Sequence, residues 1–178
     1  MSWISRRYSK VALDIRTFGD PVLKTRAAPV DTFDESLARL TEDMLATMRE
    51  NDGVGLAANQ VGRLKRVLVA SVDDEDYVIV NPVLSEESET TERGQEGCLS
   101  IPGINVEVDR ATEVTVTGQD ASGEPLNIRA SDMLARVLQH EVDHLDGVLI
   151  LDRTDRQSRK AAMREWREHL LAQQSLRP

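Results

Sequence analysis

The stretch QHEVDHLDG, residues 139–147, places two histidines four residues apart, with a glutamate directly after the first. Residues four apart lie on one face of a helix, so the imidazoles of His140 and His144 can reach the same ion. A His-Glu-x-x-His pattern is typical of zinc-type sites in which the glutamate, here Glu141, is the general base. The spacing therefore indicates metal-assisted hydrolysis, and a structural cluster of buried polar side chains is the alternative.

The predicted helix that carries this motif has its polar groups on an unusual face. At about 100° per residue, Met133 and Val137 fall in the same narrow sector as the two histidines. Glu141 lies within the adjoining apolar stripe, which is formed by Leu134, Val137, Leu138 and Leu145. Polar groups directed at a core are costly unless they are paired or coordinated. Coordination of a metal ion accounts for this arrangement better than a solvated face does.

A catalytic site needs a third protein ligand and an open position for water or substrate. Cys98 is the only cysteine of the chain and lies in QEGCLSIPG, a segment punctuated by glycine and proline. A thiolate is a strong ligand for soft or borderline ions. The other candidates are His169, Glu165 and Glu168, which lie among charges in the last predicted helix. We therefore expect Cys98 to complete the site, and a small buried cysteine without chemistry is the alternative.

A third segment, NDGVGLAANQVG at residues 51–62, has glycines at 53, 55 and 62. Glycines allow another group to approach the backbone closely. The glycine spacing is not that of a dinucleotide-binding loop. A tight turn in which Gln60 is merely polar is the alternative.

Hydrophobic periodicity predicts the elements that must position these segments. The first helix starts at an N-cap, Asp34, and ends at residues 51–53. Strands are expected at 65–72, 77–84, 104–110, 112–118 and 126–130. Residues 85–96 are expected to form an exposed polar loop. A second helix spans 131–145 and ends at Gly147, and a third spans about 157–173 with a buried stripe of Ala162, Met163, Trp166 and Leu170.

This order predicts an α+β fold, in which small antiparallel or mixed sheets pack around a central metal-binding helix, with an N-terminal and a C-terminal helix. The length of 178 residues suits one domain. A single cysteine excludes an internal disulfide and favours a reducing compartment. The chain has neither a secretory signal nor an apolar run of about 20 residues, so we expect a cytoplasmic protein that binds no membrane.

The net charge of −9 is unevenly distributed. Residues 152–178 hold seven basic and four acidic residues, a charge of +3, so the remaining part is strongly acidic and should repel DNA. The basic end is either a solvated helix face or a surface that contacts RNA.

Taken together, GVGLAANQ, EGCLS and QHEVDH, in this order, resemble the three signature motifs of the peptide deformylases. The resemblance extends from IRTFGDPVLKTRAAPV to the last helix, and the closing helix is similar to that of the bacterial type I form. It implies one catalytic domain over 1–178, with residues 1–13 as an N-terminal extension and 156–174 as the C-terminal helix. Asp132 departs from the family, which frequently has glycine there.

The resemblance implies an enzyme that removes the N-formyl group from the initiator methionine of new chains in the bacterial cytoplasm. It implies Cys98, His140 and His144 as metal ligands and Glu141 as general acid and base. The Gln60 side chain and the Leu99 N–H would hold the oxyanion, and Gly55 and Gly97 would bind substrate. The native ion of the family is typically Fe2+, which Zn2+, Ni2+ or Co2+ can replace.

The family's closing helix docks on the ribosome, which here implies RNA contact through Arg156, Arg159, Lys160, Arg164 and Arg167. For the methionine side chain we expect an apolar slot of Val54, Met133 and Val137, with plain core packing as the alternative. Asp143 either supports a ligand or, as we favour, forms an ion pair with an arginine such as Arg110.

Two other functions remain open at this point. A His-Glu-x-x-His metallopeptidase that cleaves internal peptide bonds would take a His or Glu as third ligand. A structural metal domain would need a fourth protein ligand.

Overall fold

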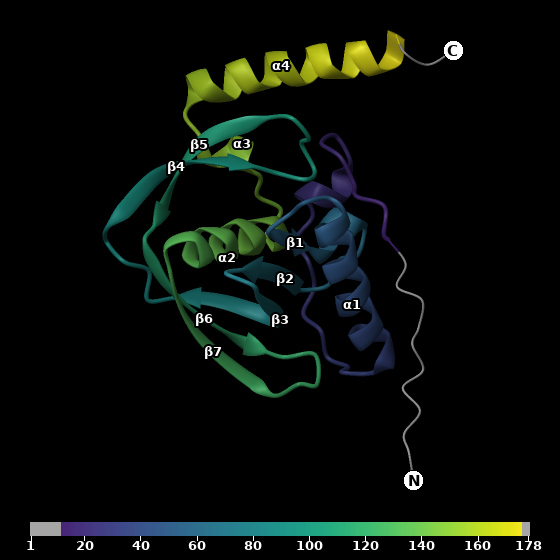
Figure 1. Cartoon of the computed structure of the whole chain (residues 1–178), viewed down its shortest axis with the longest axis vertical. Helices are drawn as coiled ribbons and strands as arrows, with labels where there is room; N and C mark the ends of the chain where they lie inside the picture. The colour runs from purple at the N-terminus through teal and green to yellow at the C-terminus, as the bar shows by residue number, and fades with distance from the viewer. Residues whose placement is uncertain (1–11, 176–178) are drawn as a thin grey trace.

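The computed structural model describes residues 12–175 and confirms the predicted α+β class (Figure 1). Its helices are α1 (Glu35–Glu50), α2 (Asp132–Leu145), α3 (Ile150–Arg153) and α4 (Arg156–Ser175), with short 3-10 helices η1 (Pro21–Lys24) and η2 (Ala58–Val61). Its strands are β1 (Gly55–Ala57), β2 (Val67–Val72), β3 (Glu75–Ser85), β4 (Thr91–Gly97), β5 (Asn105–Ala111), β6 (Glu113–Gln119) and β7 (Pro125–Ser131). The expected N-terminal extension, residues 1–13, lies almost entirely outside the described residues.

Two antiparallel sheets enclose α2. Five strands form one sheet in the order β1-β2-β3-β6-β7, and β4 pairs with β5 in a separate two-stranded ribbon. Figure 1 shows α2 between the five-stranded sheet and this ribbon, with α4 on the outer side of the ribbon. The central position of the predicted metal-binding helix is therefore confirmed.

The apolar run of β2 explains how the five-stranded sheet is covered on both faces. Side chains alternate along a strand. Leu68 and Ala70 pack in the same cluster as Leu138 and Leu145 of α2, whereas the alternate residues of β2 pack with α1 in a second cluster, which includes Leu37, Met44, Met48, Val67 and Val69. A strand that is buried on both faces reads as a continuous hydrophobic run.

Both ends of the helices follow from the sequence. Asp34 caps α1, because its Oδ1 accepts a hydrogen bond from the Leu37 N–H at 2.9 Å. Gly147 follows α2 with φ of +75°, and a Cβ at that position would lie 2.7 Å from the Lys24 carbonyl oxygen. Asp132 begins α2 at φ of +51°, a region that favours glycine.

Three local predictions were wrong or incomplete. Residues 91–96, expected in a loop, belong to β4, whose mostly exposed polar side chains give no apolar alternation. β1 and α3 are too short to produce a periodic signal. Leu170, expected in a buried stripe, is exposed, and of that stripe only Ala162 and Trp166 are buried. Within residues 12–175, no helix combines the length and the apolar character needed to cross a membrane.

We predict that Gly147→Ala will destabilise the protein more than Gly103→Ala. Both glycines have a similar positive φ, but only Gly147 faces neighbouring backbone, and nothing lies within 4 Å of a Cβ on Gly103. A positive φ costs alanine about 1–2 kcal/mol, and a steric overlap adds about 1–3 kcal/mol. Urea unfolding of the metal-free variants measures the difference. Equal decreases in stability would show that the backbone near residue 24 moves away freely.

Candidate functional site

Three side chains of the types expected for metal ligands converge where α2 meets the end of β4. Ligand atoms of Cys98, His140 and His144 all lie within 4.8 Å of one another. The Cys98 Sγ is 3.2 Å from the His144 Nε2, which is 3.1 Å from the His140 Nε2. The structure thus brings together the three residues that the sequence singled out, although Cys98 is more than forty positions away from the histidines.

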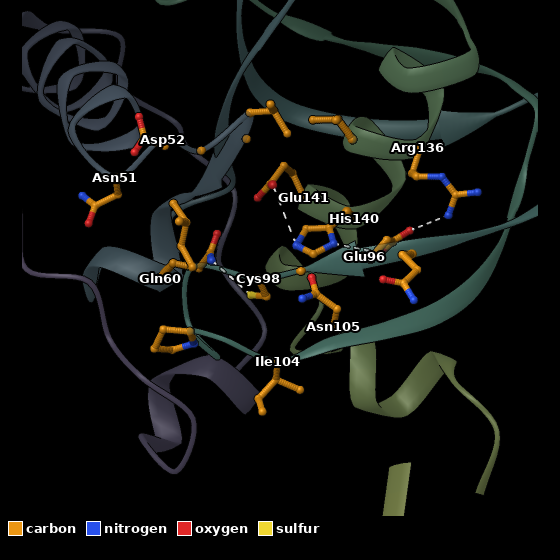
Figure 2. Close-up of a pocket in the computed structure, with 18 of the residues that line it drawn as sticks. Asn51, Asp52, Gln60, Glu96, Cys98, Ile104, Asn105, Arg136, His140 and Glu141 are labelled. Atoms are coloured by element: carbon orange, nitrogen blue, oxygen red, sulfur yellow. Dashed lines mark hydrogen bonds and ion pairs between the residues drawn. The ribbon is translucent and has the colours of Figure 1, made fainter. Parts of the chain in front are cut away.

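The orientation of the His140 imidazole is fixed by a hydrogen bond at its Nδ1, the ring nitrogen that faces away from the other two donors. The Nδ1–H of His140 donates to the Glu96 carboxylate at 2.9 Å (Figure 2). This contact directs the Nε2 lone pair of His140 toward the other two donors. A soft sulfur and two imidazole nitrogens whose donor atoms face one another at such short range fit one divalent cation of the Fe, Zn, Ni or Co group. The residues present therefore suit the metal that the motif predicts.

Glu96 is a site residue that the sequence did not reveal. It is buried, and its carboxylate accepts from the Arg110 Nε at 2.9 Å and from the Arg110 Nη2 and the Arg136 Nη1 at 3.0 Å. Burial alone would raise its pKa, but hydrogen bonds from His140 and Arg110 lower the pKa of Glu96 to about 2. The only sequence signal was its place two residues before Cys98, at the end of a segment that read as solvated.

The predicted ion pair of Asp143 is confirmed. The Arg110 Nη1 donates to the Asp143 Oδ2 at 2.6 Å, and both side chains are buried. Because Arg110 also holds Glu96, the pair reaches the metal-site histidine indirectly. The ion pair favoured from the sequence is therefore the role of Asp143 that its contacts bear out.

Glu141 lies beside the three converging donors in a nearly water-free position. Its Oε1 is 4.0 Å from the His140 Nε2, and its Oε2 has no hydrogen-bond partner within residues 12–175. Burial raises the pKa of Glu141 to about 7, against the opposing charge of His140. A Cβ on Gly55 would overlap the Glu141 carboxylate, so only glycine lets β1 pass this close. A buried carboxylate of this pKa, with one oxygen free of hydrogen-bond partners in the described residues, is suited to exchange protons near neutral pH.

Two hydrogen-bond donors face the same space. The Gln60 Oε1 accepts from the Ala57 N–H at 2.9 Å, which turns the Nε2 toward Cys98 Sγ at 3.6 Å and Ser100 Oγ at 3.1 Å. The N–H of Leu99 donates no hydrogen bond within the described part of the chain. The Leu99 N–H is therefore free to donate to a ligand in the cleft, whereas the Gln60 Nε2 donates there when its contact with Cys98 or Ser100 is exchanged.

A cleft of about 580 Å³ opens beside these residues, between the end of α1, β1, β4 and α2. Val54 and Met133 line it with 52% and 56% of their surface exposed, and Val137 lies buried in its wall. Core packing is therefore the wrong explanation for Val54 and Met133. Gly55 and Gly97 also line the cleft, which is drawn in Figure 2.

The residues considered as rival third ligands lie elsewhere. His169 stacks on Trp166 of α4 with ring centroids 5.7 Å apart and shares a hydrogen bond with Gln173. Glu165 and Glu168 are exposed on the same helix. Within residues 12–175, the ligand arrangement expected of the rival metallopeptidase is therefore not formed.

Comparison with known proteins agrees with this geometry. The family model of polypeptide deformylase matches residues 12–160. Peptide deformylase 1 of Corynebacterium efficiens is 53% identical over 154 residues, which cover 84% of this chain and 91% of that protein. The crystal structure of the peptide deformylase from Legionella pneumophila superposes with a TM-score of 0.87 at 38% identity, covering 94% of this chain and all of that one. That from Thermotoga maritima gives 0.80 at 46% identity, covering 82% and 99%.

We predict that Glu96→Gln will weaken metal binding about 10- to 100-fold, the range for partners that orient a ligating histidine. The amide loses the charge that anchors Arg110 and Arg136 and cannot accept at both positions. Competition with a chromophoric chelator measures the affinity. Glu92→Gln, an exposed change on the same strand, serves as control. Unchanged affinity in Glu96→Gln would show that the carboxylate does not orient the ligand.

Proposed function

The chain belongs to the peptide deformylase family, and on that basis we propose how its residues divide the work of the reaction. The protein is a metal-dependent amide hydrolase that removes the N-formyl group from nascent peptides. The single observation that carries our assignment is the convergence of Cys98, His140 and His144 beside the buried carboxylate of Glu141, whose Oε2 has no hydrogen-bond partner within residues 12–175.

We assign the metal to Cys98, His140 and His144, and proton transfer to Glu141. When bound, the cation supplies positive charge that acidifies water and polarises the formyl carbonyl. Glu141 takes the proton of the attacking water and then passes it to the leaving amine of methionine, so that formate and a free N-terminus result. Burial of Glu141 favours this return of the proton, because its carboxylate gains little from solvent.

Gln60 and Leu99 hold the oxygen that becomes negative as water adds. The Gln60 Nε2 is already aimed at the Cys98 sulfur by its contact with the Ala57 N–H, and the Leu99 N–H is free of other acceptors in the described chain. Donors that are placed before the reaction pay no reorganisation cost as charge develops. Each such donor is typically worth about 3–4 kcal/mol of transition-state stabilisation.

The cleft supports a methionine slot and an open strand edge. Val54, Met133 and Val137 supply apolar surface beside the metal site. β1 is an edge strand, and the Ser71 N–H donates to the Val54 carbonyl. Because backbone groups alternate in direction along a strand, Gly55 presents its N–H and C=O to the open edge. A peptide that adds there is read through its backbone, which suits an enzyme that serves many sequences.

We predict that Glu141→Gln will retain the metal but lower formate release from a formyl-Met peptide about 10²- to 10⁴-fold. Cys98→Ser should instead lose metal affinity, because serine supplies no thiolate. Elemental analysis and a formate assay on both variants separate binding from chemistry. An internal-bond peptidase would retain its metal in Cys98→Ser, and a structural domain would show no turnover to lose in Glu141→Gln.

We further propose Fe2+ as the native ion. The ligand set suits Fe2+, Zn2+, Ni2+ and Co2+ alike, and the choice of iron rests on the family. Anaerobic purification followed by elemental analysis should give one iron per chain, with activity that falls in air as the ion or the thiolate is oxidised. Full activity with one zinc per chain, stable in air, would contradict this assignment.

The basic face of α4 is proposed to contact the ribosome, which would place the enzyme in the cytoplasm beside emerging chains. Arg156, Lys160, Arg164 and Arg167 line one shallow surface of this helix. Only Ala162 and Trp166 of α4 are buried, so most of the helix is available to a partner.

We predict that Lys160→Glu/Arg164→Glu will weaken ribosome co-sedimentation at low salt and flatten its salt dependence, by about one unit of slope for each phosphate that the helix no longer neutralises. Arg63→Glu/Arg129→Glu changes the net charge equally on other surfaces and is the matched control. If both pairs reduce binding alike, net charge rather than α4 explains the association.

A further inference from the structure

Arg153, on the short helix α3, is joined to the metal site by a chain of charged contacts that the reaction itself does not use. Its guanidinium holds both oxygens of Asp143, with the Nη2 2.5 Å from Oδ1 and the Nε 3.0 Å from Oδ2. The same Asp143 Oδ2 accepts from the Arg110 Nη1 at 2.6 Å. Arg153 and Arg110 therefore hold the same carboxylate, and both contact its Oδ2.

The series of charged contacts continues from Asp143 to His140, a proposed metal ligand. Arg110 grips Glu96 with its Nε at 2.9 Å and its Nη2 at 3.0 Å, and Glu96 accepts from the His140 Nδ1–H at 2.9 Å. The side chains of Arg110 and Glu96 are 5% exposed, and that of Asp143 is 10% exposed. Water has little access to replace the contacts of Arg110, so both carboxylates depend on their arginines: Asp143 on Arg110 and Arg153, and Glu96 on Arg110 and Arg136.

Arg110 is shared between the carboxylates of Asp143 and Glu96, so the loss of Arg153 from Asp143 affects how Arg110 binds Glu96. Within residues 12–175, Oδ1 of Asp143 receives no donor other than Arg153. Without Arg153, a buried carboxylate would be left half-paired and would draw more strongly on Arg110. Rotation of the Arg110 guanidinium toward Asp143 would loosen its two-point grip on Glu96, and with it the partner that orients His140.

We propose that Arg153 is a positioning residue for His140, acting through Asp143, Arg110 and Glu96. This inference rests on the proposed assignment of His140 as a metal ligand. Arg153 is the last residue of α3, three residues before α4 begins at Arg156. The contact of Arg153 with Asp143 therefore links the start of the C-terminal helix to the charged cluster beside His140.

Arg153→Met, which keeps the aliphatic stem and removes the donors, tests the inference against Arg159→Met. The two arginines are matched, since their side chains are 49% and 50% exposed, and Arg159 binds Leu151 and Asp152 without touching Asp143. In the metal-free protein, proton NMR reports the His140 Nδ1–H and its exchange with water. Chelator competition reports metal affinity.

We expect Arg153→Met to speed exchange of the His140 proton and to weaken metal binding about 3- to 10-fold, within the range for residues that act through others. Arg153→Lys, which restores charge without the two-point contact, should lie between wild type and Arg153→Met. Arg159→Met should change neither readout. The inference is overturned if Arg153→Met leaves the His140 proton exchange and the metal affinity unchanged, whatever its effect on the melting temperature.

The two assignments can fail separately. Unchanged metal affinity in Glu96→Gln would overturn the role of His140 as an oriented ligand. The NMR signal is read without metal, so it still decides whether Arg153 positions the ring.

Discussion

The buried carboxylate of Glu96 is the contact on which the rest of the site depends. It accepts hydrogen bonds from His140 and Arg136 of α2 and from Arg110 of β5. A charge removed from water must be fully paired, so these partners cannot be satisfied unless the β4–β5 ribbon sits on α2 in one register. The same requirement brings Cys98, two residues further along, against the two histidines.

The two sides of α2 therefore contribute differently: one packs in the apolar core, and the other holds the charged and polar groups of the site. Leu138 and Leu145 bury apolar surface against the five-stranded sheet, which supplies stability. The opposite side places its polar groups under the ribbon, where charge pairing supplies geometry rather than net stability. Glu141 lies at the boundary, close enough to apolar surface to have a raised pKa and close enough to His140 to share its site.

Function requires that part of this ordered region stay open. The edge of β1 and the N–H of Leu99 have no backbone partner within residues 12–175, and together with the exposed side chains of Val54 and Met133 they lie at one cleft. Such groups cost little while they face solvent, and they are the groups that we propose a bound peptide to contact. In the proposed division of roles, the buried charged cluster serves metal binding and the cleft beside it serves substrate recognition.

The sequence by itself determined the helices and strands that have a clear hydrophobic repeat, and the metal chemistry that follows from the His-Glu-x-x-His motif. The residues of α1, α2 and most strands follow hydrophobic repeats, and His140, Glu141 and His144 follow a local spacing that any helix would present on one face. Cys98 was identified by its residue type, and Gln60 and Leu99 only through resemblance. The paired Asp143 and Arg110 were anticipated because a charge near a core needs a partner. Only the tertiary structure decided that β4 is a strand, that Glu96 is buried, and that Arg153 closes the charged chain. These features depend on contacts between residues far apart in sequence, and a polar side chain reads the same in a local pattern whether water or a buried arginine satisfies it.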